Sequence, residues 1–200
     1  LMALGGDPLK GEIRFDRSLL QDRKSVNPLG AGADQLLVGH ALGMGKGVAI
    51  HAAGVADGRG RGYLFAGQSE AGKSTLSRLW QAEPGALILS DDRVILREQE
   101  GRLWMHGTPW SAEGGFANPG RLPLDAVFLL RKGKATGVSP LPAAECAARL
   151  MSCAFVPPYS PPALSFTLEF LERVAASIPC YELLFLPEKA AVQFIQDSFP

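Results

Sequence analysis

The stretch Gly67-Gln68-Ser69-Glu70-Ala71-Gly72-Lys73-Ser74-Thr75 decides the fold of this chain. Its first eight residues match G-x-x-x-x-G-K-[ST], the pattern of a loop that holds nucleotide phosphates. The two glycines allow a tight turn in which successive N–H groups converge on phosphate oxygens. Lys73 would add a positive charge for the β- and γ-phosphates, and the Ser74 hydroxyl is a hard oxygen ligand for Mg²⁺. The alternative is a glycine-rich turn with an incidental lysine.

The sequence on either side of the loop fits this motif. The apolar run Tyr63–Ala66 predicts a strand before it. The segment from Lys73 to Gln81 predicts a helix after it, with an apolar side made by Leu76, Leu79 and Trp80. The N-terminus of such a helix carries a positive partial charge that would face the same phosphates. We therefore expect a strand, a phosphate-binding loop and a helix, in that order.

A second motif, Leu87-Ile-Leu-Ser-Asp91-Asp92, places two acids at the end of an apolar strand. Carboxylates at a strand tip beside a phosphate loop are typical of magnesium-binding strands. Adjacent side chains of an extended chain point in different directions. One acid could therefore hold the metal while the other accepts the proton of an attacking hydroxyl. The alternative is a solvated Asp-Asp turn that ends the strand.

A histidine belongs to the apolar strand that comes before the phosphate loop. The sequence Gly47–Gly54 predicts this strand, and we expect His51 to close it. If the two strands lie side by side in one sheet, the imidazole would lie near the phosphates. A single histidine can equally be a satisfied core residue.

Residues 107–124 are rich in glycine, proline and tryptophan and predict a long ordered loop, a kind of segment that often carries function. Glu113 in this loop could be a second ligand for metal or substrate, and His106 could support the site by hydrogen bonding. The alternative is that these polar side chains are solvated. Three basic residues are candidates for stabilising a transferring charge: Arg121, Arg131 and Lys132.

Helical and strand patterns alternate along the rest of the chain. We expect further helices at about 35–44, 143–153, 164–176 and 190–199, further strands at 126–130 and 181–185, and hairpins at 57–62 and 94–105. The alternation favours an α/β fold, and the hairpins favour a mixed sheet. We expect an N-terminal segment, residues 1–44, with a short strand around Ile13 and Phe15, followed by a phosphate-binding domain of residues 45–200.

The composition argues against some classes of function. The 20 basic residues balance 20 acidic ones, so a general nucleic-acid-binding surface is not expected. Apolar runs stay shorter than the roughly 18 residues of a transmembrane helix, so we expect no membrane partner. The cysteines Cys146, Cys153 and Cys180 form neither a CxxC pair nor a metal-ligand spacing with histidine, which favours reduced thiols and a cytoplasmic protein.

The strand with His51, the phosphate loop and Ser90-Asp91-Asp92-Arg93-Val94 together resemble the catalytic domain of HPr kinase/phosphorylase, a bacterial serine kinase of the sugar phosphotransferase system. The chain is more similar still to small HPr-kinase-like proteins found beside peptide-modification genes, in the segment His106-Gly-Thr-Pro-Trp110, in Glu113 and in Leu186–Ile195. The resemblance covers about residues 45–195. It implies a mixed-sheet P-loop fold of the HPr kinase C-terminal and phosphoenolpyruvate carboxykinase type.

The resemblance also implies ATP and Mg²⁺ as cofactors, with Lys73 and Ser74 on the phosphates and the metal. It implies Asp91 as the catalytic acid–base. Three further residues would assist the metal, the substrate or the reaction: Asp92, Glu113 and His51. Glu70 and Thr75 stand where the family usually has a glycine and an acid, and the family's Leu-x-x-Arg-Gly-Leu-Gly segment is absent.

The leading hypothesis is a Mg-ATP-dependent kinase that phosphorylates a Ser or Thr hydroxyl of a small protein or peptide. A small-molecule kinase is the rival among enzymes. A nucleotide-binding regulatory module with little turnover stays open because of the departures at Glu70 and Thr75, and so does a homo-oligomeric state.

Overall fold

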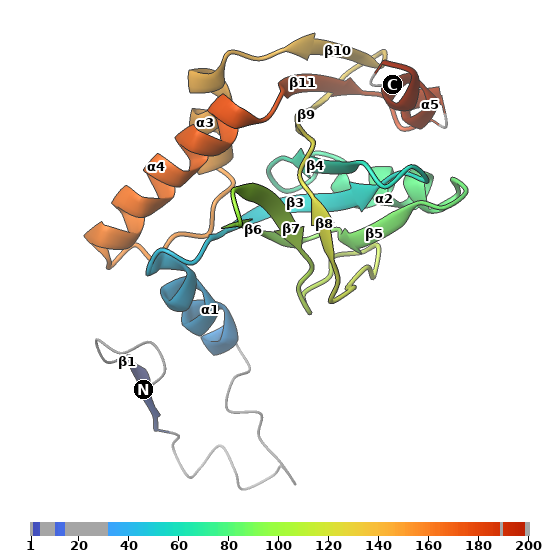
Figure 1. The fold of residues 1–200 in the computed structure, drawn as a ribbon. Coiled ribbons are helices and arrows are strands. Elements are labelled where there is room, and N and C mark those ends of the chain that lie inside the picture. The colour runs from blue at the N-terminus through green and yellow to red at the C-terminus, as the bar shows by residue number, and fades with distance from the viewer. Residues whose placement is uncertain (1, 5–10, 15–31, 189, 199–200) are drawn as a thin grey trace, which may run out of the picture.

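A mixed β-sheet forms the centre of the molecule and helices lie on both of its faces (Figure 1). The computed structural model describes residues 2–4, 11–14, 32–188 and 190–198. Within these residues, no helix has the length and apolar character needed to cross a membrane.

The sheet has nine strands and joins a parallel half to an antiparallel half. From edge to edge the strands are β10 (Gly137–Pro140), β11 (Cys180–Phe185), β9 (Ala126–Lys132), β4 (Gly62–Ala66), β3 (Val48–Ala56), β6 (Arg93–Gln99), β7 (Arg102–His106) and β8 (Arg121–Pro123), and β5 (Leu87–Ser90) also pairs with β3. Strands β11, β9 and β4 are parallel, and all other pairs are antiparallel. The mixed α/β fold expected from the sequence is confirmed.

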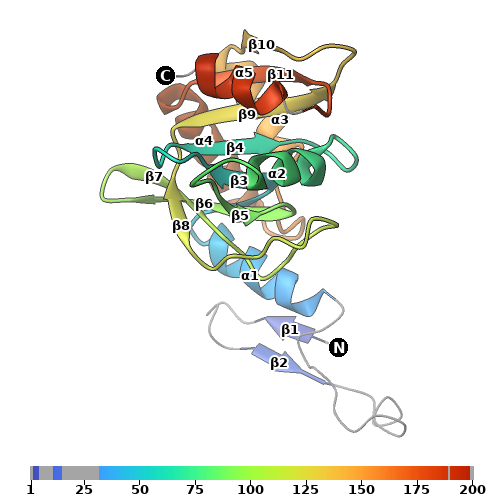
Figure 2. The same cartoon turned by 90° about the vertical axis from the view of Figure 1, so that its right-hand side faces the viewer.

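The two faces of the sheet carry separate hydrophobic cores. On one face, α2 (Lys73–Gln81) and α5 (Ala190–Ser198) cover Tyr63 and Phe65 of β4. On the other, α3 (Ala143–Met151) and α4 (Pro161–Ser177) cover Leu64 and Ala66 of the same strand, in agreement with the alternation of side chains along a strand (Figure 2). Helix α1 (Ala33–Gly43) packs against α4 and β3.

A break between two short strands positions the acidic motif. Strand β5 pairs with the C-terminal half of β3, and β6 pairs with its N-terminal half. Asp91 and Asp92 lie between these two strands, and the Asp92 carbonyl accepts a hydrogen bond from the Ala52 N–H at 3.1 Å. The two acids are therefore held against the middle of β3 rather than in a free turn.

Most elements expected from the sequence are present, with a few differences. His51 lies inside β3 and does not close it, because the strand continues to Ala56. The expected long loop contains the short strand β8 near its end, and β10 was not expected at all. In the N-terminal segment, β1 (Met2–Leu4) pairs with β2 (Gly11–Ile13), while Phe15 lies outside the described residues.

Candidate nucleotide and phosphoryl-transfer site

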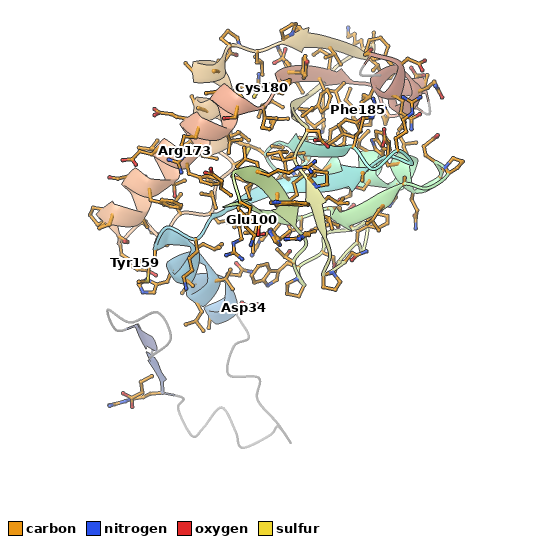
Figure 3. All side chains as sticks on the ribbon, viewed as in Figure 1. Asp34, Glu100, Tyr159, Arg173, Cys180 and Phe185 are labelled. Carbon is orange, nitrogen blue, oxygen red and sulfur yellow. The ribbon has the colours of Figure 1, made fainter. Side chains whose placement is uncertain are left out.

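The phosphate loop follows β4 directly and leads into α2, as the motif predicts. A Cβ on Gly67 would lie 2.8 Å from the Cβ of Ala71, so the loop closes too tightly for any side chain there. Gly72 has a φ of 105° and lies 3.1 Å, measured from a hypothetical Cβ, from the ring of Phe185, which is labelled in Figure 3. Both glycines of the motif are thus required by the shape of the loop.

Lys73 is buried inside the loop, with 5% of its surface exposed. Its Nζ donates hydrogen bonds to the carbonyls of Gly67 and Gln68, both at 2.8 Å. Burial lowers the pKa of Lys73 to about 8, while the nearby Cys153, Asp92 and Asp91 act in the opposite direction. The ammonium group is therefore held at the centre of the loop, close to both acids of the second motif.

Asp91 is fully buried and its carboxylate is used by the 107–120 loop. One oxygen accepts a hydrogen bond from the Ala112 N–H at 3.1 Å, and the other accepts one from the Gly114 N–H at 2.7 Å. These two bonds fasten the loop to the tip of β5. The Asp91 carboxylate does not line the neighbouring pocket, and neither do Lys73 and Ser74, so the acid–base role expected for Asp91 stays a prediction.

The side chain of Asp92, and not that of Asp91, lines the pocket. One carboxylate oxygen lies 3.3 Å from His51 Nδ1, and the other lies 3.3 Å from Arg93 Nε. The hydrogen bond from His51 is the largest cause that lowers the pKa of Asp92, and burial opposes it; Arg93 and Lys73 also lower it. Asp92 is therefore a charged carboxylate at neutral pH, at the centre of three basic groups.

The hydrogen bonding of His51 determines which ring nitrogen carries its proton. Nδ1 lies 2.9 Å from the backbone carbonyl of Asp92, and a carbonyl can only accept a hydrogen bond. Nδ1 must therefore carry the proton, and in the neutral ring Nε2 is left as a base. The backbone carbonyl of Asp92 thus sets the tautomer of the His51 ring, and the Asp92 carboxylate helps to orient the ring.

These residues share a pocket of about 600 Å³ with the phosphate loop. Its lining comes from β3, from the outer part of the loop, from the acidic motif and from the segment after α3: His51, Gln68, Ser69, Asp92, Arg93, Ser152, Cys153, Ala154 and Phe155. The pocket is large enough for a phosphoryl group together with a side chain that carries an acceptor hydroxyl.

The donors available for Mg²⁺ are oxygens. Ser74 is half-buried in the first turn of α2, and Asp92 offers a charged carboxylate beside the loop. Magnesium at nucleotide sites needs one or two protein oxygens and takes its other ligands from phosphates and water, so this donor set fits it. The described residues contain no cluster of three or more His, Cys, Asp or Glu that could hold a metal without a nucleotide.

Several predicted site residues lie elsewhere or play another part. The Glu113 side chain is exposed, and it is its backbone carbonyl that accepts a hydrogen bond, from Arg78 of α2 at 2.7 Å. His106 lies in β7, where burial lowers its pKa. The three basic candidates do not line the pocket: Arg121 bonds to Gln99, Arg131 pairs with Glu182, and Lys132 is exposed at the end of β9.

Other site residues were not found by sequence reasoning. Arg93 follows the acids directly and its charge was a usable signal. Cys153 and Phe155 offered none, because they reach the pocket only through long-range pairing of the segment after α3 with β3. In that pairing the N–H of Phe155 donates to the carbonyl of Ala49 at 2.9 Å, and the N–H of His51 donates to the carbonyl of Cys153 at 2.8 Å.

Comparisons with known proteins give likenesses of fold and no sequence relative. No protein-family model matches the chain, and no curated protein matches it. Among solved structures, the chain is similar to one titled as the structure of the Hpr(Ser) kinase/phosphatase from Coxiella burnetii. That likeness has a TM-score of 0.42 and 13% sequence identity, and it covers 75% of this chain and 95% of the other.

Proposed function

We propose that this protein is a Mg-ATP-dependent phosphotransferase, a kinase that transfers a phosphoryl group to a Ser or Thr hydroxyl of a protein or peptide. One observation carries the proposal. The outer residues of a phosphate loop closed around Lys73 share a single pocket with the His51–Asp92 pair. The phosphate loop and a candidate base would thus border one space, as phosphoryl transfer to a hydroxyl requires.

The nucleotide would be held by the loop. Its backbone N–H groups and the N-terminus of α2 bind the phosphates, and Lys73 exchanges its bonds to the Gly67 and Gln68 carbonyls for bonds to phosphate oxygens. Ser74 and Asp92 would hold Mg²⁺, which when bound neutralises charge on the phosphates.

The acceptor hydroxyl would give its proton to His51. With its Nδ1 proton held by the backbone of Asp92, His51 presents Nε2 as the accepting nitrogen, and the Asp92 carboxylate stabilises the imidazolium that forms. We propose this pair for the base role in place of Asp91, because the Asp91 carboxylate accepts two hydrogen bonds from the 107–120 loop.

The test separates binding from transfer. We expect isothermal titration calorimetry to show saturable binding of Mg-ATP by the wild type and a loss of at least tenfold in affinity for Lys73→Ala, because a buried charge–phosphate contact disappears. His51→Gln should keep nucleotide affinity and lose about a hundredfold or more in transfer rate to a panel of peptides. Asp92→Asn should lose transfer to the same extent and also weaken Mg-ATP binding, because its carboxylate would hold the metal.

The variant Asp91→Asn tests whether the Asp91 carboxylate stabilises the 107–120 loop. It places an amide where two backbone N–H groups converge, so we expect a loss of thermal stability of about 1–3 kcal/mol. Absence of ATP binding by the wild type would refute the proposal. Binding without transfer to any protein, peptide or small-molecule acceptor would instead identify a nucleotide-binding regulatory module.

A further inference from the structure

Arg93 is held in the pocket by a clamp of two aromatic rings. Its guanidinium carbon lies 4.4 Å from the ring centre of Phe155 and 5.3 Å from that of Trp110. The side chain is 16% exposed and lines the same pocket as His51 and Gln68. Stacked rings cover the faces of a guanidinium and leave its in-plane N–H groups available for binding.

The indole of Trp110 and the backbone of Phe155 are each anchored by hydrogen bonds. The indole N–H of Trp110 donates to a carboxylate oxygen of Asp34 at 2.8 Å, and the Trp110 carbonyl accepts a hydrogen bond from Ser90 Oγ at 3.1 Å. Asp34, labelled in Figure 3, belongs to α1, so the Trp110 ring is tied to a second element of the fold. Phe155 is held by the backbone bond from its N–H to Ala49.

One donor of the Arg93 guanidinium group is left unpaired by the described residues. Its Nε is buried and has no hydrogen-bond partner among the described residues. The carboxylate of Asp92 lies 3.3 Å from this atom as an ion pair, without the geometry of a hydrogen bond. A buried donor without a partner costs free energy that an anionic ligand would recover.

We propose that Arg93 binds the terminal phosphoryl group of the nucleotide and makes the site prefer a triphosphate to a diphosphate. The inference rests on the proposed function. Gln68 and Ser69 bring the outer edge of the phosphate loop to the pocket that Arg93 also lines, so we expect the terminal phosphate to be the anion that Arg93 meets. A cation fixed at this point also offsets the charge that develops on the transferring group.

The test compares two nucleotides by calorimetry with magnesium present: ADP and an ATP analogue with a β–γ imido bridge. We expect Arg93→Met to weaken binding of the analogue about tenfold to a hundredfold and to leave the affinity for ADP within about twofold. Arg121→Met is the matched control, because Arg121 also lies 4.4 Å from an aromatic ring, that of Trp104, but does not line the pocket. It should change neither affinity.

Equal weakening of both nucleotides by Arg93→Met, or no weakening of the analogue, would overturn the inference while leaving the proposed function standing. Binding of neither nucleotide by the wild type would overturn both. If Arg93→Met does not fold, Phe155→Leu provides the measurement, since that ring is 39% exposed and its loss should still reduce the preference for the analogue several-fold.

Discussion

At the scale of single residues, the charge of Lys73 depends on what surrounds its ammonium group. Lys73 is almost fully buried, and burial lowers its pKa to about 8, well below the ordinary value of 10.5. Its ammonium group is thus easily deprotonated without a ligand, whereas bound phosphates would favour the charged form. Binding of a nucleotide at this loop would therefore be coupled to protonation of Lys73.

We expect nucleotide binding to take up a proton above pH 8. At pH 8.5, roughly three quarters of the free protein would carry neutral Lys73, so binding should draw about that fraction of a proton from the solvent. Near pH 7 this contribution should be close to zero. Calorimetry in two buffers with different heats of ionisation measures the uptake, and equal apparent heats in both buffers at pH 8.5 would contradict the prediction.

Unfolding of the ligand-free protein gives an independent control. The unfolded chain binds more protons than the folded one between pH 8 and 10.5, so the contribution of Lys73 to stability rises with pH across that window. Lys73→Met should lack this rise in urea unfolding. Parallel profiles for the two proteins would show that Lys73 is not the titrating group.

The same scale shows what the sequence could reveal about the site. The motif identified the loop and Lys73, because spacing alone specifies that turn. It could not tell which of Asp91 and Asp92 faces the pocket, because strand alternation separates adjacent side chains but does not give their phase. That phase depends on where β5 ends and β6 begins against β3, which is a matter of long-range register.

At the scale of elements, the 107–120 loop is shaped by backbone contacts at its base. The N–H of Gly107 donates to the carbonyl of Gly120 at 3.0 Å, and the N–H of Asn118 donates to the carbonyl of Leu89 at 2.7 Å. Asp91 and Arg78 then fasten the middle of the loop to β5 and α2. We therefore expect a change at the base of the loop, or at the attachments of its middle, to affect the structure of the whole loop.

We expect Gly107→Ala to loosen the whole loop. A Cβ at this position would lie 1.7 Å from the carbonyl oxygen of Asn118, which cannot be relieved without moving the backbone. The melting temperature should fall by about 5 °C or more, and chymotrypsin should cleave at Trp110 or Phe116. Gly115→Ala is the control: its φ is 74° but a Cβ would meet nothing within 4 Å, so it should cost only about 1 kcal/mol. Equal effects of the two changes would contradict this account.

The elements that the sequence missed are short and depend on their neighbours. β8 has three residues and ends in Pro123, and β10 has four and ends in Pro140. Their own residues carry too little alternation to indicate a strand. They are ordered by pairing with β7 and β11, which sequence patterns close to them cannot show.

At the scale of the whole molecule, one sheet separates two cores. Leu150 of α3 and Ile195 of α5 are both fully buried, one in each core. Because the sheet lies between them, we expect Leu150→Ala and Ile195→Ala each to cost about 2–5 kcal/mol in urea unfolding and the double variant to cost their sum within about 0.5 kcal/mol.

Two residues from the same core serve as the control for this prediction. Leu150 and Val174 belong to the same cluster, so Leu150→Ala with Val174→Ala should depart from additivity by more than that margin. If the unfolding free energies of Leu150→Ala and Ile195→Ala also fail to add, the two cores are not independent.

The contacts of the two loop glycines determine when the phosphate loop can form during synthesis. Gly67 rests on Leu130 of β9, and Gly72 rests on the ring of Phe185 of β11. A ribosome releases the chain from its N-terminus onward, so the whole phosphate motif emerges long before either supporting strand. A nascent chain thus carries the complete motif before the strands that support it, so the loop can take its final shape only after Phe185 has emerged.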